Sequence, residues 1–296
     1  MSNANSWTHY WQQGHLESCI DNQSPDNNEI TALWQVFANN LRKDAVVVDL
    51  ATGNGSVIKK LHAIVPNCHY VGIDYATIAP RWAEQYQHIE FIGNTSIDNI
   101  PFETQSVDAI TSQFGFEYGL SQQSISELAR ILKPKGLLQL VVHHSESEIV
   151  EPAKLRLQEI EWLIAPNSIV DSLGGFVAET ISIAELEGIG KAYLAEHENK
   201  LTQSISGQCF SVINQVIQLV ENGMATSAAE LFERLSASMQ QEQKRLSQLI
   251  SVAQTAHAIT EFVASLNDAQ LSVESQVIRS NQGNPLAWLI KGYKHG

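Results

Sequence analysis

The segment that most constrains this chain runs from residue 45 to residue 60 and reads AVVVDLATGNGSVIKK. Its first four residues are apolar or β-branched, which is typical of a short strand buried on both faces of a parallel sheet. Asp49 closes the strand, a loop with Gly53 and Gly55 follows, and a helical pattern begins directly afterwards. Glycines let the backbone turn tightly and approach a ligand without a Cβ in the way. The segment therefore predicts a strand, a glycine turn and a helix that form a nucleotide-binding crevice.

Strand-like and helical segments alternate over residues 45–144. After the first strand, further strands are expected at residues 69–73, 89–92, 107–112 and 137–143, with helices at residues 29–41, 56–61, 78–86 and 123–132. This alternation predicts an open parallel sheet with helices on both faces. Right-handed crossovers then place the C-terminal ends of the strands, and a bound ligand, on one edge.

The pattern changes after residue 144. From residue 151 to about 266 only helical periodicity is found, including one long amphipathic segment over 230–266. Strand-like segments return at 270–280 and 286–293, and a short polar turn joins them. They predict an antiparallel hairpin.

The composition disfavours several classes of partner. The chain has 18 Lys+Arg against 32 Asp+Glu, a formal net charge of −14, which argues against nucleic acid and anionic membrane surfaces. Cys19, Cys68 and Cys209 fit neither a zinc site nor a disulfide framework, so we expect free thiols in a reducing compartment. With no signal peptide or apolar span in the sequence, we expect a cytoplasmic protein, and we assign no metal site.

Three aromatic residues near the N-terminus, Trp7, Tyr10 and Trp11, are spaced as on a helix. They predict either a lid that rests on a ligand or an anchor that packs the terminus onto the domain. The sequence leaves both readings open.

Several motifs in order resemble those of class I S-adenosylmethionine-dependent methyltransferases. DLATGNG at 49–55 resembles that family's Asp-x-Gly-x-Gly-x-Gly turn, with Ala51 in place of the first glycine, as is frequent in the ubiquinone/menaquinone biosynthesis C-methyltransferase branch. GIDY at 72–75 resembles the second motif, and RILKPKGLL at 130–138 resembles the stretch before the fifth strand. The resemblance covers about residues 31–144 and 268–293.

The resemblance implies an α/β, Rossmann-like sheet of seven mostly parallel strands with a reversed C-terminal strand. The helical periodicity adds an all-helical insertion before the last two strands. The expected organisation is an N-terminal lid segment over 1–28, a cofactor-binding domain over 29–150 and 267–296, and the insertion over 151–266. The insertion would cap the substrate site, form a homodimer contact, or do both.

The cofactor implied is S-adenosyl-L-methionine, with S-adenosyl-L-homocysteine as product. By resemblance, Asp49 orients the glycine turn or meets the amino group of the cofactor, and Asp74 accepts the ribose hydroxyls. Asn94 stands where the family usually has an aspartate. The remaining cofactor-binding residues are expected to be Ala51, Thr52, Gly53 and Gly55 at the methionine moiety, Tyr75, Asn94 and Thr95 at the adenine, Gln113 and Phe114 near the sulfonium, and Tyr10 and Trp11 from the lid.

Methyl transfer is an in-line displacement, so alignment of the reactants in a dry site is the main requirement. A general base is needed only if the acceptor must lose a proton. The catalytic candidates are His143, Glu117 and Tyr118, all just past strand ends. Because adjacent strand residues point to opposite faces, His143 and His144 cannot both face the same pocket. A purely structural role for each histidine stays open.

The leading hypothesis is a methyltransferase that acts on a small organic molecule. An alternative is a catalytically silent cofactor-binding module whose helical insertion engages a protein partner. A nicotinamide-dependent dehydrogenase is disfavoured, because Ile58 stands where that fingerprint needs its third glycine.

Overall fold

The computed structural model describes residues 3–19, 26–197 and 205–296, which divide into two compact units. The first unit contains the chain up to Glu151 and again from Ser251 onward, and the second contains Pro152–Ile250. No helix in the described part of the chain is long and apolar enough to cross a membrane.

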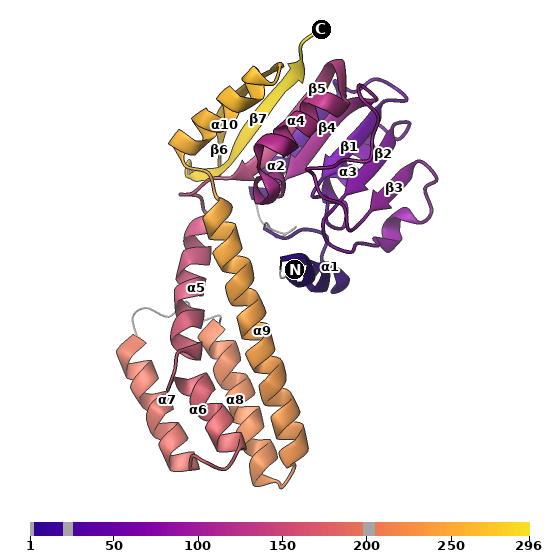
Figure 1. Cartoon of the computed structure of the whole chain (residues 1–296). Coiled ribbons are helices and arrows are strands. Elements are labelled where there is room, and N and C mark those ends of the chain that lie inside the picture. The colour runs from indigo at the N-terminus through magenta and orange to yellow at the C-terminus, as the bar shows by residue number, and fades with distance from the viewer. Residues whose placement is uncertain (1–2, 20–25, 198–204) are drawn as a thin grey trace. The chain divides into compact units, whose positions relative to one another are not determined.

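The first unit is built on a seven-stranded sheet in the order β3-β2-β1-β4-β5-β7-β6 (Figure 1). Strands β1 to β5 pair in parallel, and β7 runs antiparallel to both β5 and β6. The predicted Rossmann-like sheet with a reversed C-terminal strand is therefore confirmed. The strands are β1 (Val46–Leu50), β2 (His69–Ile73), β3 (Ile89–Ile92), β4 (Val107–Gln113), β5 (Leu132–His143), β6 (Leu271–Arg279) and β7 (Pro285–Lys294).

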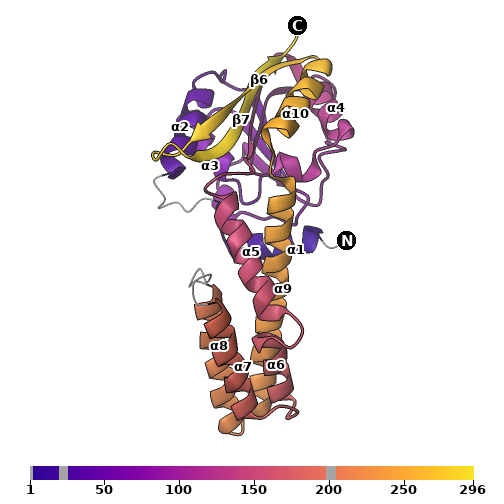
Figure 2. The same ribbon diagram turned by 90° about the vertical axis from the view of Figure 1, so that its left-hand side faces the viewer.

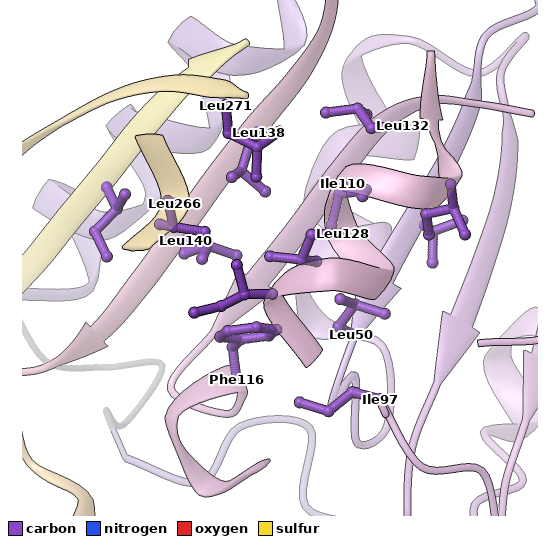
Figure 3. Close-up of a cluster of buried hydrophobic side chains, with 14 of the residues drawn as sticks. Leu50, Ile97, Ile110, Phe116, Leu128, Leu132, Leu138, Leu140, Leu266 and Leu271 are labelled. Atoms are coloured by element: carbon purple, nitrogen blue, oxygen red, sulfur yellow. The ribbon is translucent and has the colours of Figure 1, made fainter. Parts of the chain in front are cut away.

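Helices cover both faces of this sheet, because neighbouring residues of each strand point to opposite sides. Val47 faces the core under α2 (Asp26–Ala38) and α3 (Ser56–Ile64), where Trp34 and Ile58 are fully buried. Val48 faces the opposite core, under α4 (Gln122–Ile131) and α10 (Ala256–Asp268). Figure 3 shows side chains of this second core, with Leu128 of α4 and Leu266 of α10.

The helix expected at residues 78–86 is not formed. Only a single 3₁₀ turn, η1 (Arg81–Ala83), is present there. Pro80 disfavours helical backbone in the residue before it, which explains why the helix does not start at Ile78. The indole Nε1 of Trp82 instead donates to the carbonyl of Asn54, 2.8 Å away in the glycine turn.

The second unit is helical and contains α5 (Val150–Ile164), α6 (Ile169–Val177), α7 (Ile183–His197), α8 (Ile205–Glu221) and α9 (Ala225–Val252), which form a bundle (Figure 2). Only α5 and α9 extend beyond its limits, by two residues each. Buried Glu159 of α5 accepts a 2.8 Å hydrogen bond from the first turn of α8.

The expected amphipathic segment over 230–266 is two helices rather than one. Helix α9 ends at Val252, and Thr255 caps α10 by accepting a hydrogen bond from Ala258 N at 3.1 Å. Helix α10 packs on the sheet, where the rings of Phe262 and Phe116 stack with centroids 5.8 Å apart. The helical unit therefore ends at 250 and not at 266.

The chain enters and leaves the helical unit at neighbouring points of the sheet unit. Ser145 N donates to Gln254 O at 3.1 Å, and Gln254 N donates to His143 O at 2.8 Å. The indole of Trp288 on β7 donates to the same Gln254 carbonyl at 3.0 Å.

Truncation of Leu266 to alanine tests whether α10 belongs to the sheet unit. Leu266 is fully buried against the sheet core, so Leu266→Ala should lower the free energy of unfolding of that unit by about 2–5 kcal/mol. Urea denaturation followed by circular dichroism measures the change. The control is Val36→Ala on α2, where the side chain is 65% exposed and a loss below about 0.5 kcal/mol is expected. Equal effects of the two substitutions would contradict this packing.

Candidate cofactor site

Asp49 is buried at the end of β1, where it ties the glycine turn to β4. Its two carboxylate oxygens accept hydrogen bonds from Thr52 Oγ1 at 2.6 Å and from Thr111 Oγ1 at 2.7 Å. Burial raises the pKa of Asp49 to about 7, although both hydroxyl hydrogen bonds lower it. Of the two roles expected for Asp49, the structure shows the orientation of the turn.

The turn itself requires residues that tolerate a left-handed backbone. Ala51, Gly53 and Gly55 have φ values of 51°, 53° and 79°, which are costly for most side chains and readily adopted by glycine. A Cβ on Gly53 would collide with the ring of Trp11, and one on Gly55 would lie 2.5 Å from Phe91. The two glycines thus form a close-fitting cradle directly before the N-terminus of α3.

Asp74, at the end of β2, faces the same turn. Its carboxylate accepts from Gly53 N at 2.7 Å and from Ala76 N at 2.8 Å, and burial raises its pKa. A carboxylate offers about four acceptor positions, so Asp74 keeps the capacity to accept further hydrogen bonds. The carboxylates of Asp49 and Asp74 thus both hydrogen-bond to residues of this turn.

The residues expected at the adenine gather beside Asp74. Thr95 N donates to Asp74 O at 2.9 Å, and Asn94 Oδ1 accepts from Thr77 Oγ1 at 3.0 Å. Tyr75 is 58% exposed and does not pack in the core.

The two residues expected near the sulfonium differ in their surroundings. Gln113 Oε1 accepts a 2.7 Å hydrogen bond from the indole of Trp34 on α2, so its amide is engaged with that helix. Its place near the sulfonium stays a prediction. Phe114 is buried, and its ring centroid lies 4.6 Å from that of His143.

His143 and Glu117 form a buried pair at the ends of β5 and β4, where Glu117 belongs to η2 (Phe116–Gly119). His143 Nδ1 lies 2.6 Å from Glu117 Oε1, which also accepts from His143 N at 2.9 Å. The ring of Tyr118 is 6.1 Å from that of His143. His144 points elsewhere and stacks on Trp288 at 4.8 Å, in agreement with strand alternation.

Cys19 is a site residue that the sequence analysis missed. Its Sγ lies 3.2 Å from His143 Nε2, the ring nitrogen opposite Glu117. Burial alone would lower the pKa of His143, but its contacts with Cys19 and Glu117 raise it to about 10. The two partners are 124 residues apart in the chain, and no local motif signals their contact.

The N-terminal segment, with helix α1 (Asn3–Gln12), lies on the glycine turn. Asn54 Nδ2 donates to the carbonyls of Trp11 and His15 at 2.9 and 2.6 Å. Glu17 accepts from Ser56 Oγ at 2.7 Å and pairs with Lys60 at 2.5 Å. Tyr10 donates its hydroxyl to Glu17 O at 2.9 Å. The segment is thus held against the turn, while residues 20–25 of the expected lid lie outside the described residues.

Comparison with known proteins agrees with this geometry. Residues 47–136 match the family described as methyltransferase domain. A demethylmenaquinone methyltransferase of Thermotoga maritima is 37% identical over 94 residues, which cover 31% of this chain and 41% of the relative. The ubiquinone/menaquinone biosynthesis C-methyltransferase UbiE of Campylobacter jejuni is 27% identical over 180 residues, 54% of this chain and 75% of the relative.

Residues 47–136 of this chain therefore form a methyltransferase domain. A chain from the complex between the Haloferax volcanii Trm112 methyltransferase activator and a methyltransferase has the same fold, with a TM-score of 0.51, 15% identity and 98% coverage of both chains. The match to the Thermotoga relative spans less than half of that relative's length.

S-adenosyl-L-methionine is the cofactor of this methyltransferase family, and the residues present fit it. The close-fitting glycine cradle lies between two buried carboxyls, Asp49 and Asp74, and before a helix N-terminus that favours a carboxylate. Among the described residues, no group of three or more His, Cys, Asp or Glu is arranged to hold a metal ion.

The raised pKa of Asp49 predicts a measurable pH dependence of stability. The folded state holds this proton more tightly than the unfolded chain does, with a pKa of about 7 against 3.8. The stabilisation is therefore present below about pH 4 and is lost as the pH rises towards 7. Between about pH 5 and pH 8 the free energy of unfolding should fall by about 2–3 kcal/mol relative to that of Asp49→Asn.

Urea denaturation of the two proteins across this range measures the difference. The asparagine variant keeps one oxygen for a threonine hydroxyl but has no proton to lose. Parallel pH profiles for the two proteins would show that Asp49 is ionised throughout and that burial does not control it.

Proposed function

We propose that this protein is an S-adenosylmethionine-dependent methyltransferase that moves a methyl group to a small organic acceptor. The observation that carries the proposal is the glycine turn held between Asp49 and Asp74 at the C-terminal edge of the sheet. This edge is where open α/β sheets bind their ligands. The methyltransferase-domain match over residues 47–136 includes both carboxyls.

The chain's own residues divide the work of binding. Asp49 holds the turn in shape through Thr52 and Thr111, so that the backbone at Gly53 and Gly55 meets the methionine moiety. The carboxylate of Asp74 would accept the ribose hydroxyls, as charged acceptors bind them strongly. Further cofactor contacts are proposed for Tyr75, Asn94 and Thr95 at the adenine, Phe114 near the sulfonium, and Tyr10 and Trp11 on the N-terminal segment.

The cofactor carries the methyl group on a sulfonium sulfur. After the transfer, the rest of the cofactor leaves as a neutral thioether. The protein therefore has to hold the acceptor in line with the methyl carbon and to keep water out. The buried His143–Glu117 pair supports a general-base role at the same edge, since Glu117 fixes the ring by accepting from Nδ1 and leaves Nε2 to handle a proton. Tyr118 lies beside the pair and is the third catalytic candidate.

Binding of the cofactor tests the proposal directly. Isothermal titration with S-adenosylmethionine and S-adenosylhomocysteine should show binding of both to the wild-type protein. Asp74→Asn removes the charge from an acceptor of the ribose hydroxyls and should weaken the binding free energy by roughly 1.5–3 kcal/mol.

The matched control is Glu261→Gln on α10, where the side chain is 70% exposed and no change in affinity is expected. Circular dichroism verifies that both variants are folded. If neither ligand binds to the wild-type protein, the proposal is wrong, and an unchanged affinity of Asp74→Asn would place the ribose elsewhere.

A further inference from the structure

Three polar side chains from separate parts of the chain form a continuous line at the C-terminal edge of the sheet. Glu117 Oε1 lies 2.6 Å from His143 Nδ1, and His143 Nε2 lies 3.2 Å from Cys19 Sγ. The side chains of Glu117 and His143 are completely buried. The second carboxylate oxygen, Glu117 Oε2, has no hydrogen-bond partner among the described residues, so the carboxylate is not fully used by the protein fold.

A sulfur, an imidazole and a carboxylate in this order form the arrangement that activates a thiol. The carboxylate orients the ring, and the ring takes the proton from sulfur. With ordinary pKa values of about 8.5 for a thiol and about 6.5 for imidazole, proton transfer in water is unfavourable by about two pKa units. A buried carboxylate beside the ring shifts the equilibrium towards the ion pair. Within the described ranges, the titratable groups that face His143 are Cys19, Glu117 and Tyr118. Both ring nitrogens are engaged along the line.

The position of this line relates it to the proposed methyl transfer. His143 ends β5, and Glu117 lies just after β4, the strand next to β1, which carries Asp49. The rings of Phe114 and Tyr118 border His143, and Trp7 of α1 lies edge-on to Tyr118 at 5.5 Å. Cys19 belongs to the same N-terminal segment that rests on the glycine turn. The Cys19 thiol therefore lies at hydrogen-bond distance from His143 Nε2, the nitrogen that would accept the proton. It belongs to the segment that covers the site.

We propose that the Cys19 thiol holds the place of the methyl acceptor, and that the acceptor is a small thiol which displaces Cys19 from His143. The inference rests on the proposed methyltransferase function and assigns its acceptor class. The acceptor S–H gives its proton to His143 Nε2, and a sulfur lone pair forms the new S–CH₃ bond as the bond from the methyl carbon to the sulfonium sulfur breaks. The products are a methyl thioether, S-adenosylhomocysteine and a proton that leaves from the imidazolium.

A thiol fits this place better than an alcohol. An aliphatic alcohol is far too weak an acid to transfer its proton to imidazole, whereas the pKa of a thiol lies only about two units above that of imidazole. A thiol is also the group that the structure places at hydrogen-bond distance from Nε2. Phenols and amines are the competing acceptor classes, and they enter as arms of the test.

The first experiment measures the thiol without any methyl transfer. Iodoacetamide labelling of the full chain, followed by mass spectrometry of the Cys19 peptide, gives the alkylation rate between about pH 5 and pH 9. Near pH 6 the wild-type Cys19 should react at least about 10-fold faster than in His143→Gln, and Glu117→Gln should fall between them.

Cys68 and Cys209 are internal controls, because burial raises the pKa of both, that of Cys209 to about 12. They should stay slow in all three proteins, which also reports that each variant is folded. If the Cys19 rate has the same pH profile in wild type and His143→Gln, the relay does not exist and the inference is overturned.

The second experiment identifies the acceptor. Formation of S-adenosylhomocysteine is followed with a panel of small alkyl and aryl thiols, phenols and amines. Thiols should be methylated, and Cys19→Ala should lower the KM for the thiol several-fold with little change in kcat. His143→Gln should lower kcat instead. Cys68→Ala, which removes a cysteine away from the site, should match the wild type.

The outcomes separate this inference from the function on which it rests. If the cofactor binds but only phenols or amines are methylated, or no thiol is methylated by wild type or Cys19→Ala, the thiol assignment is wrong and the methyltransferase proposal stands. Failure of the cofactor to bind rejects the proposed function itself. An unchanged KM for thiols in Cys19→Ala would show that Cys19 does not occupy the acceptor's place.

Discussion

The buried carboxyl of Asp49 is the group on which the site depends. It ends β1, and its hydrogen bonds to Thr52 and Thr111 join the glycine turn to the neighbouring strand β4. Because the carboxyl is almost wholly removed from water, these hydroxyls are its main means of satisfying its oxygens, and the turn cannot move away without leaving a buried polar group unpaired. The left-handed residues of the turn are tolerable because this anchor fixes the backbone around them.

Other parts of the sheet edge contact the glycine turn that Asp49 holds. Asp74 reaches the turn from β2 through the amide of Gly53, and the N-terminal segment reaches it through Asn54 and the ring of Trp11. The same segment carries Cys19 to His143. The glycine turn and the histidine–carboxylate pair are therefore both contacted by one stretch of chain. Under the proposed function, that stretch is a common element of donor and acceptor binding.

The parts of this structure that could be predicted from the sequence are those signalled by residues close together in the chain. Asp49 to Gly55 and Asp74 each signal a strand end within a few positions, so the sheet and the proposed cofactor residues could be assigned. Contacts between distant segments could not. No residue near Cys19 in the sequence indicates its contact with His143. In the same way, no residue near Gln113 indicates that Trp34 donates a hydrogen bond to its amide oxygen. The absence of the helix expected at residues 78–86, around Trp82, has a local cause in Pro80, which helical periodicity alone does not reveal. The break between α9 and α10 also had a local signal, the capping residue Thr255.

The hydrogen bonds around Gln254 have a consequence for how such a protein can change. The two segments that lead into and out of the helical unit are hydrogen-bonded to each other through Ser145 and Gln254. A hydrogen bond from Trp288 joins them to the sheet. A segment whose two ends meet in this way is attached like a loop, so its length and content can vary without altering the geometry at its base. The helical unit is thus a replaceable module in evolutionary terms, and relatives could share the cofactor edge while carrying quite different structures at this single point of insertion.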